Sequence, residues 1–109
     1  MSGRRAELAE NLAAVHGRVG AACVAAGRDP GSVTIVAITK TWPAGDVALL
    51  ADLGIRHVGE NRDQEAREKA AACAELDLIW HFVGQLQRNK AASVARYADI
   101  VESVDRWAA

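Results

Sequence analysis

Four short segments rich in apolar and β-branched residues recur at an almost constant interval, and this repeat constrains the fold more than any other feature. The segments start near residues 33, 55, 78 and 100, about 22 residues apart, and a stretch with helical periodicity follows each of the first three. Parallel strands require crossover connections, which are usually helices. The pattern therefore predicts a βα repeat with parallel strands at Val33–Thr39, Ile55–Gly59, Leu78–Val83 and Ile100–Val104.

Helices are predicted between these strands and ahead of the first one, at Ala44–Leu53, Asn61–Leu76, Leu86–Ala98 and Arg4–Gly27. The longest helix carries an apolar stripe at three- and four-residue steps, formed by Leu8, Leu12, Val15, Val19 and Cys23. It is expected to stop at the Gly-Arg-Asp-Pro-Gly sequence that begins at Gly27, because glycine and proline interrupt helices.

The helix predicted at Asn61–Leu76 has a polar start and a charged side. Asn61 is expected to be its N-cap residue, because an asparagine side chain can accept a hydrogen bond from the first turn. Two pairs of opposite charge at a spacing of four residues, Asp63 with Arg67 and Glu65 with Lys69, are expected on its exposed side.

Nearly every residue of Val33–Thr39 is apolar or β-branched, which predicts a strand covered on both faces and therefore a parallel sheet. Strands and helices that alternate at this pitch fit an open doubly wound sheet or a (β/α)8 barrel, and periodicity leaves both open. A barrel of eight units usually takes about 250 residues, whereas this sequence of 109 residues contains four predicted strands. The chain therefore corresponds to half of such a barrel.

A four-stranded half-barrel would leave two strand edges and its inner apolar face unpaired, which promotes association. We therefore expect residues 1–109 to be a fragment of a longer chain. The alternative is that two copies associate through their open edges and close a barrel together.

Half of the residues are hydrophobic and a quarter are charged, which is typical of one folded domain. The formal net charge is −1, so neither nucleic acid nor an anionic membrane is favoured as a partner. No apolar run approaches the roughly 20 residues of a membrane helix, and the first residues do not form a signal-peptide core, so a cytoplasmic location is expected. Cys23 and Cys73 stand apart without a CxxC spacing, and we expect both to be inert thiols.

Functional residues of parallel α/β folds gather where strands end, and Lys40 closes the first predicted strand. It shares a strand face with Ile38 and Val36, so its stem would leave an apolar surface with partial desolvation of the amine. A lysine that is neutral part of the time can attack an aldehyde and form an imine. The competing interpretation is a strand-end lysine that extends into water.

Other strand ends carry polar residues for which structural and functional interpretations compete. Glu60 is expected to face solvent or to pair with a base, and Asn61 could face a ligand instead of capping a helix. His81 lies between two aromatic residues, so a core position is the simpler interpretation. The run Gln85–Lys90 brings cations and amides near a predicted helix start, where anions are favoured, although such runs are usually solvated. No glycine pattern and no Cys/His spacing indicates a nucleotide or metal site.

Four motifs taken together resemble the YggS/PROSC family of pyridoxal phosphate homeostasis proteins. The motifs are AITKTWP at Ala37–Pro43, HVGENRDQEA at His57–Ala66, WHFVGQLQRNK at Trp80–Lys90 and ESVD at Glu102–Asp105. Their order and intervals match the family from the first helix to the end of the chain. The resemblance implies a barrel like the amino-terminal domain of alanine racemase, and so favours the barrel over the open sheet. It also implies that residues 1–109 are the amino-terminal part of a single pyridoxal phosphate-binding (β/α)8 barrel domain.

The resemblance also implies that pyridoxal 5'-phosphate (PLP) is held as a Schiff base on Lys40. Asn61 matches the asparagine of the family's GEN motif near the cofactor, while His81 and Ser103 match positions on neighbouring strand ends. Ile38 would flank the cofactor ring. These five residues form the cofactor site that the resemblance implies.

The function implied by the resemblance is binding of PLP in cofactor homeostasis, without robust catalysis. The alternative is an amino-acid racemase on the same barrel, which would need a second acid/base residue, usually a tyrosine. The chain's one tyrosine, Tyr97, lies in a predicted helix and is poorly placed for this role. A third class is a non-catalytic module whose open edges recruit another chain.

The sequence departs from the family pattern at two points. Trp42 stands where many relatives have a second lysine shortly after the cofactor lysine. The family's phosphate-binding segment and the arginine expected near the pyridine nitrogen lie in a carboxyl-terminal half that these 109 residues do not include. We therefore expect this chain alone to bind PLP weakly.

Overall fold

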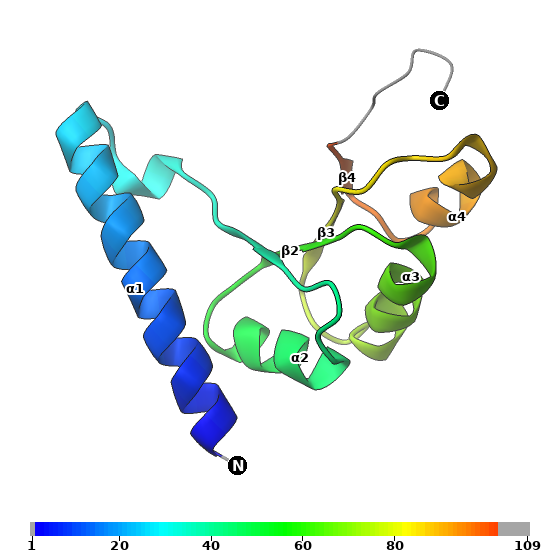
Figure 1. The fold of residues 1–109 in the computed structure, drawn as a ribbon, viewed down its shortest axis with the longest axis horizontal. Helices are drawn as coiled ribbons and strands as arrows, with labels where there is room; N and C mark the ends of the chain where they lie inside the picture. Colours follow the sequence, from blue (N-terminus) through cyan, green and yellow to red (C-terminus); the bar gives the residue numbers. More distant parts are fainter. Residues whose placement is uncertain (1, 103–109) are drawn as a thin grey trace. The chain divides into compact units, whose positions relative to one another are not determined.

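The computed structural model describes residues 2–102, which divide between two compact units, Met1–Ile35 and Val36–Ala109. The first unit contains the long helix α1 (Ser2–Ala26) and the short 3-10 helix η1 (Pro30–Ser32) (Figure 1). The helix ends where Gly27 adopts a φ of 72°, and the Arg28 N–H then donates to the Cys23 carbonyl at 2.9 Å. Glycine takes this left-handed conformation without steric cost, so the predicted stop is confirmed.

The second unit contains a sheet of four parallel strands, β1 (Val36–Ile38), β2 (His57–Glu60), β3 (Ile79–Phe82) and β4 (Ile100–Val101). The strands follow one another in the sheet in the order in which they follow in the chain. Helices connect them, namely α2 (Ala44–Asp52), α3 (Asp63–Ala72) and, after the 3-10 helix η2 (Arg88–Lys90), α4 (Ala91–Ala95). The predicted βα repeat is confirmed.

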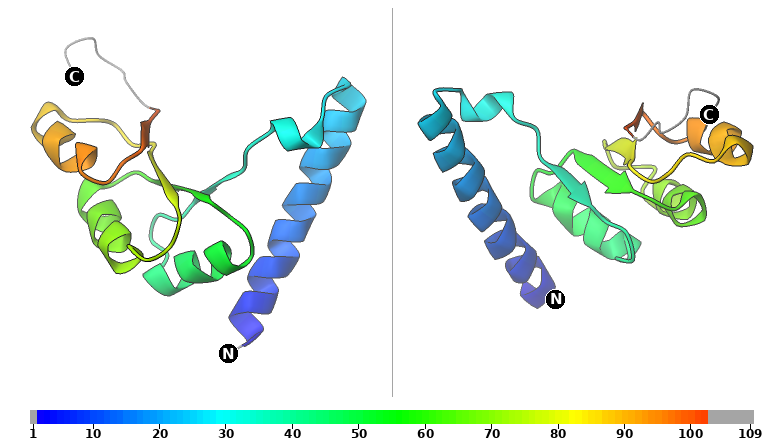
Figure 2. Two further views of the ribbon diagram at one scale, coloured as in Figure 1. Left: turned by 180° about the vertical axis from the view of Figure 1, so that it is seen from behind. Right: turned by 45° about the horizontal axis from the view of Figure 1, so that its top comes forward.

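The strand order selects between the two architectures that periodicity left open. A doubly wound sheet reverses its strand order at a switch point, whereas this sheet runs β1-β2-β3-β4 without reversal. Right-handed crossovers between successive neighbours place their helices on one side of the sheet, and α2 and α3 lie on the same side in both views of Figure 2. The fold is therefore the α/β winding of a parallel barrel, with four strands.

The first strand is shorter than predicted, and its cover differs from the expectation. β1 begins at Val36 and not at Val33, because its first residue pairs with His57, where the neighbouring strand starts. Coverage on both faces was also wrong for this strand: the Ile38 side chain is 46% exposed. The helices of the second unit cover one face of the sheet and leave the other open in the part of the chain described.

The segment predicted as one helix at Leu86–Ala98 is instead a loop, a 3-10 turn and a short helix. Gln87 is extended, with φ of −84° and ψ of 142°, so no helix passes through it. The α-helical part is only α4, in which Val94 is the single buried residue. Since helices in proteins depend on packing of an apolar face, the exposed residues before α4 do not extend it.

The core of the second unit lies between the sheet and its helices. It consists of small and medium-sized apolar side chains, with one tryptophan and one phenylalanine from β3: Val47, Ala51, Ile55, Val58, Ala66, Cys73, Trp80, Phe82 and Val94. Cys23 and Cys73 are both buried and unbridged, and burial raises the pKa of the Cys73 thiol, as an inert thiol requires. Among the described helices, none combines the length and apolar character needed to cross a bilayer.

Candidate functional site

Lys40 lies two residues after the end of β1, just past the last backbone contact with β2. The Thr39 N–H donates to the Gly59 carbonyl at 2.9 Å, so strand pairing continues to the residue before the lysine. Lys40 itself is exposed to solvent. The described part of the chain thus leaves the Lys40 side chain exposed, where partial desolvation by an apolar surface was expected. The amine is accessible to a solute.

Glu60, the last residue of β2, is completely buried and paired with a base. Lys69 of α3 contacts it at 3.0 Å between Nζ and Oε2, and contacts Glu65 at 2.9 Å. The Glu65–Lys69 pair predicted from its spacing exists, but its expected position on an exposed face was wrong, since Lys69 is buried. The acid at the end of β2 draws this lysine inward, because a buried carboxylate requires a cation.

Asn61 follows Glu60 and does not cap the next helix. The N-cap position belongs to Arg62, without a side-chain hydrogen bond, so the N-cap prediction for Asn61 was wrong. Asn61 is half-buried, and its Oδ1 atom is inaccessible and has no hydrogen-bond partner among the described residues. A buried oxygen of this kind is costly unless a ligand or water donates to it. Asn61 therefore offers an acceptor at the strand ends.

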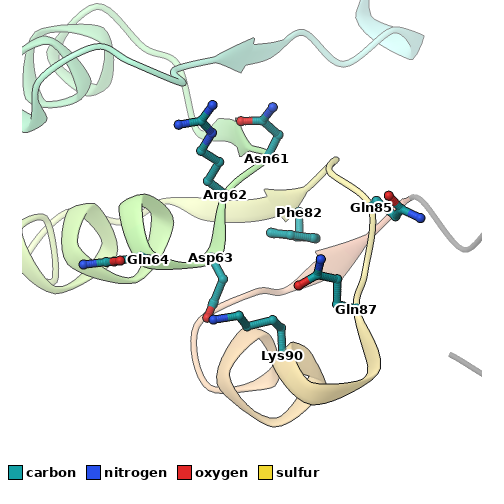
Figure 3. Close-up of a pocket in the computed structure, with 8 residues that line it drawn as sticks. All are labelled: Asn61, Arg62, Asp63, Gln64, Phe82, Gln85, Gln87 and Lys90. Carbon is teal, nitrogen blue, oxygen red and sulfur yellow. The ribbon is translucent and has the colours of Figure 1, made fainter.

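A cavity of about 320 Å³ opens beside Asn61, at the carboxyl ends of β2 and β3 (Figure 3). Its lining is mostly amide and charged side chains, with the ring of one aromatic residue: Asn61, Arg62, Asp63, Gln64, Phe82, Gln85, Gln87 and Lys90. Three residues of the predicted anion-favouring run, Gln85, Gln87 and Lys90, are among them. The run thus borders a cavity, although it does not begin a long helix.

Gly84 keeps this cavity's wall close to the end of β2. A Cβ atom on Gly84 would lie 2.2 Å from the carbonyl oxygen of Asn61. Such a separation is far below van der Waals contact, so only glycine allows the loop after β3 to pass this close to the backbone. Gly84 therefore helps to determine where Asn61 is held.

Asp63, also in the cavity wall, accepts two hydrogen bonds from the last connection of the sheet. Ser93 Oγ and Tyr97 Oη each donate to its Oδ1 atom at 3.0 Å. Burial, and then the hydrogen bond to Asp63, raise the pKa of the Tyr97 hydroxyl well above its ordinary value. Tyr97 lies just after α4, so the prediction that it lies within a helix was wrong. Its hydroxyl is committed to a structural contact.

His81 lies on the face of the sheet that the helices leave open. It is buried, as expected for a core histidine, and it is the register partner of Gly59, which in turn pairs with Ile38. A Cβ atom on Gly59 would lie 2.7 Å from Ile38 Cδ1, so the glycine makes room for the isoleucine. The fold thus brings Ile38 and His81 into one row across three strands.

Both ring nitrogens of His81 have partners that sequence reasoning did not identify. His57 Nδ1 lies 2.9 Å from His81 Nε2, and Glu102 contacts His81 Nδ1. The alternation of side chains along parallel strands could have indicated this cluster, because the two histidines lie on the same face of neighbouring strands. No three His, Cys, Asp or Glu side chains within residues 2–102 form a group that could hold a metal ion. Ser103, the fifth predicted site residue, lies outside the described residues.

Comparisons with known proteins identify relatives of this chain. No family model matches the sequence. The pyridoxal phosphate homeostasis protein of Mycobacterium tuberculosis (strain H37Rv) is 49% identical over 112 residues, which cover 94% of this chain and 43% of the relative. The protein of the same name from Escherichia coli (strain K12) is 41% identical, with 92% of this chain and 44% of the relative covered.

Solved structures agree with these relatives. PipY of Synechococcus elongatus PCC7942, in a structure with PLP bound, is 40% identical and superposes with a TM-score of 0.76 over 92% of this chain and 43% of PipY. An unknown protein from Bifidobacterium adolescentis superposes with a TM-score of 0.85 at 36% identity, over 96% of this chain and 47% of its own. The chain spans less than half the length of the relatives that it matches. Over that part, the chain is a homologue of the pyridoxal phosphate homeostasis proteins.

Proposed function

We propose that this chain forms part of a PLP site in which Lys40 supplies the amine, and that it serves in PLP homeostasis without robust catalysis. The observation that carries the proposal is the position of Lys40, an exposed lysine two residues after the first parallel strand. Ligand sites of such folds lie at this end of the sheet. The PLP bound to the homologue PipY supports the same assignment of cofactor.

The described residues fit the aldehyde end of PLP. When bound, PLP supplies an aldehyde that condenses with an amine to an imine with loss of one water molecule. Lys40 is accessible for this reaction, and Asn61 Oδ1, which is buried without a partner among the described residues, would accept a hydrogen bond from a ligand hydroxyl once the side chain turned toward the ligand. These two features lie after neighbouring strands, β1 and β2.

Ile38 and His81 would line the site on the open face of the sheet. They lie on either side of Gly59 in one row across the sheet. Ile38 places an apolar side chain shortly before Lys40, and the His81 imidazole is held by His57 and Glu102. The apolar side chain suits the face of a pyridine ring, and the imidazole gives the site a fixed polar group. Ser103, which lies outside the described residues, is the remaining member of the proposed set.

The contacts of Tyr97 favour a binding protein over a racemase. A racemase on this barrel would need a second acid/base group opposite the lysine. The chain's one tyrosine donates its hydroxyl hydrogen bond to Asp63 and is shifted toward the neutral form. We therefore expect no steady racemisation of L- or D-alanine by the PLP-treated chain, measured by chiral chromatography.

Reductive trapping tests the assignment of Lys40. The chain contains three lysines, Lys40, Lys69 and Lys90, so peptide mass spectrometry after borohydride reduction identifies the reacting amine without ambiguity. We expect PLP to be trapped on Lys40, with an imine absorbance band that is lost in Lys40→Ala and kept in the exposed-lysine control Lys90→Ala. An unchanged band in Lys40→Ala, or trapping on Lys90 instead, would contradict the proposal.

We further propose that this chain binds PLP weakly and self-associates. A single imine bond is hydrolysed reversibly in water, so the imine absorbance band should fade on dilution unless borohydride has first reduced the imine. The open face of the sheet exposes Ile38 and Ile100, and strands with free edges pair readily. Light scattering coupled to size-exclusion chromatography should therefore show dimers or larger species, whereas a stable monomer would contradict self-association.

A further inference from the structure

The backbone on both sides of Lys40 is tied to one buried group of charged side chains. The carbonyl of Thr39, the preceding residue, accepts a hydrogen bond from Lys69 Nζ. The N–H of Thr41, the following residue, donates to Glu65 Oε2 at 2.5 Å. Lys69 and Glu65 contact each other at 2.9 Å, so a single ion pair on α3 holds the chain before and after Lys40.

Lys69 is the centre of this group, which we call the Lys69 cluster: Thr39, Glu60, Glu65 and Lys69. An ammonium group has three N–H donors. Lys69 Nζ contacts three acceptors, the Thr39 carbonyl, Glu60 Oε2 at 3.0 Å and Glu65 Oε2 at 2.9 Å. The Thr39 hydroxyl also donates to Glu60 Oε2. Lys69 is therefore held in one orientation, and its amine is not free to react.

The burial of the Lys69 cluster argues for a geometric role. The exposed fractions are 0% for Glu60, 2% for Thr39 and 8% for the Lys69 side chain, while the Glu65 side chain at the edge of the cluster is 26% exposed. Buried ion pairs contribute little net stability compared with well-packed apolar residues, because both charges lose their hydration. In addition, Glu60 Oε1 is buried without a partner among the described residues. Stability alone does not account for such an arrangement.

The turn that carries Lys40 has a conformation that requires support. Thr41 has a φ of 66°, which is rare for a β-branched residue, and it is the one described non-glycine residue with a positive φ. The Trp42 N–H donates to the Thr39 carbonyl at 3.1 Å and closes the turn around Lys40. The same carbonyl is held by Lys69, while Glu65 holds the N–H of Thr41.

We propose that Lys69, together with Glu60 and Glu65, positions Lys40 by holding the turn Thr39–Trp42, so that the Lys40 amine leaves the end of β1 in one direction. The inference rests on the proposed role of Lys40 and deepens it by naming residues that act through the backbone of the turn. Lys69 and the two glutamates are positioning residues, since the side-chain hydrogen bonds and ion pairs described for them are to one another and to the turn.

The substitution Glu65→Ala is the sharpest test, because it removes the contact to Thr41 and leaves the buried Glu60–Lys69 pair in place. Glu68→Ala is its matched control: the same change on the same helix, at an exposed position. In Glu65→Ala, amide hydrogen exchange of Thr41 should accelerate roughly tenfold or more, the factor expected from loss of one charge-assisted hydrogen bond. Exchange in Glu68→Ala should match that of the unsubstituted chain.

Two labelling reactions separate positioning from exposure. The ratio of borohydride-trapped PLP on Lys40 to that on Lys90 should fall roughly tenfold in Glu65→Ala, because the amine no longer leaves the turn in one direction. The ratio of the two lysines' acetylation by acetic anhydride should stay unchanged, since Lys40 remains exposed. A Glu65→Ala chain that is folded by circular dichroism and shows unaltered Thr41 exchange or an unaltered PLP ratio would overturn the inference.

Lys69→Met extends the test to the centre of the cluster. It should accelerate the amide hydrogen exchange of Thr41 and lower the Lys40-to-Lys90 ratio of trapped PLP, as Glu65→Ala does. Trapping of PLP on Lys69 in the unsubstituted chain would overturn the inference. If Lys69→Met does not fold, Glu65→Ala still decides. If PLP fails to label Lys40 in the unsubstituted chain, the proposed function fails, whereas the exchange of Thr41 still shows whether the cluster holds the turn.

Discussion

His57 Nδ1 lies 2.9 Å from His81 Nε2, and this contact joins β2 to β3 on the open face of the sheet. On its other side, His81 Nδ1 contacts a carboxylate oxygen of Glu102. An ionised carboxylate only accepts hydrogen bonds, so His81 Nδ1 carries the proton. In the neutral ring, His81 Nε2 is then an acceptor, and His57 must donate from Nδ1. The contacts therefore assign the Nδ1–H tautomer to both histidines.

Nitrogen-15 NMR of the imidazole rings at alkaline pH checks this assignment. We expect Nδ1–H tautomers for His57 and His81, while exposed His16 on α1 is an internal reference with no such constraint. Glu102→Ala should remove the preference at His81, because the acceptor that orients its ring is gone. An Nε2–H tautomer at His81 in the unsubstituted chain would show that the three-residue contact is wrong.

Gly84→Ala should destabilise the second unit, because the new methyl group would lie 2.2 Å from the Asn61 carbonyl oxygen and one backbone must move. We expect the free energy of unfolding to fall by about 1–3 kcal/mol or more, the usual cost of overpacking. Gly17→Ala is the control, since its Cβ meets nothing within 4 Å on exposed helix α1, and it should stabilise the helix by about 0.5–1 kcal/mol. Urea denaturation monitored by tryptophan fluorescence and circular dichroism measures both, and equal effects would refute the close approach at Gly84.

The contribution of Glu65 to stability should depend on pH in the acid range. Its hydrogen bond from Lys69, and then its bond from the Thr41 N–H and the nearby cations, hold the pKa of the Glu65 carboxyl below its ordinary value of 4.5, against the opposing effect of burial. A carboxyl with a lowered folded-state pKa stabilises the fold above its unfolded-state pKa, and this contribution disappears as pH falls through the folded-state pKa. The difference in urea midpoint between the unsubstituted chain and Glu65→Gln should thus be largest at neutral pH. It should decrease as the pH falls below about 4.5. A difference that is constant from pH 7 to pH 3 would rule out this linkage.

Tyr97 should resist ionisation, because burial and the Asp63 carboxylate raise the pKa of its hydroxyl well above 10. An acid with a raised folded-state pKa stabilises the fold at pH values below its unfolded-state pKa. This contribution is lost as the pH rises toward the folded-state pKa. Since the chain has one tyrosine, absorbance near the tyrosinate band reports on it alone. We expect no tyrosinate signal at pH 10 in the folded chain and a normal titration in urea. A normal titration without urea would contradict the Tyr97–Asp63 contact.

Tyr97→Phe should lower the free energy of unfolding by about 1.5–3 kcal/mol, the range for a hydrogen bond to a charged group. Ser93→Ala removes the second donor to the same Asp63 oxygen, and both lie at 3.0 Å. Because the two hydroxyls share one acceptor, their effects should not add in the double variant. Additive losses in urea denaturation would indicate that the two contacts are independent.

The sequence predicted the repeat because its signal is local. Strand and helix periodicities around Ala37, Val58 and Trp80 follow from residues that are neighbours in the chain, and the glycine after α1 marks its end without reference to the rest of the molecule. Strand lengths were less certain from sequence, because β1 extends only as far as β2 provides partners. The first turn of a helix is equally dependent on surroundings, which is why Asn61 was wrongly predicted as an N-cap.

By itself, the sequence determined the parallel α/β repeat, the strand-end position of Lys40 and, through four motifs, the resemblance to the PLP homeostasis proteins. Only the tertiary structure decided that Lys69 turns inward to Glu60, that Thr39 and Thr41 are held on either side of Lys40, and that His57, His81 and Glu102 meet. Periodicity indicates which face of an element a residue occupies. It does not indicate which buried charges meet, because that depends on the register of strands and on helices distant in the chain.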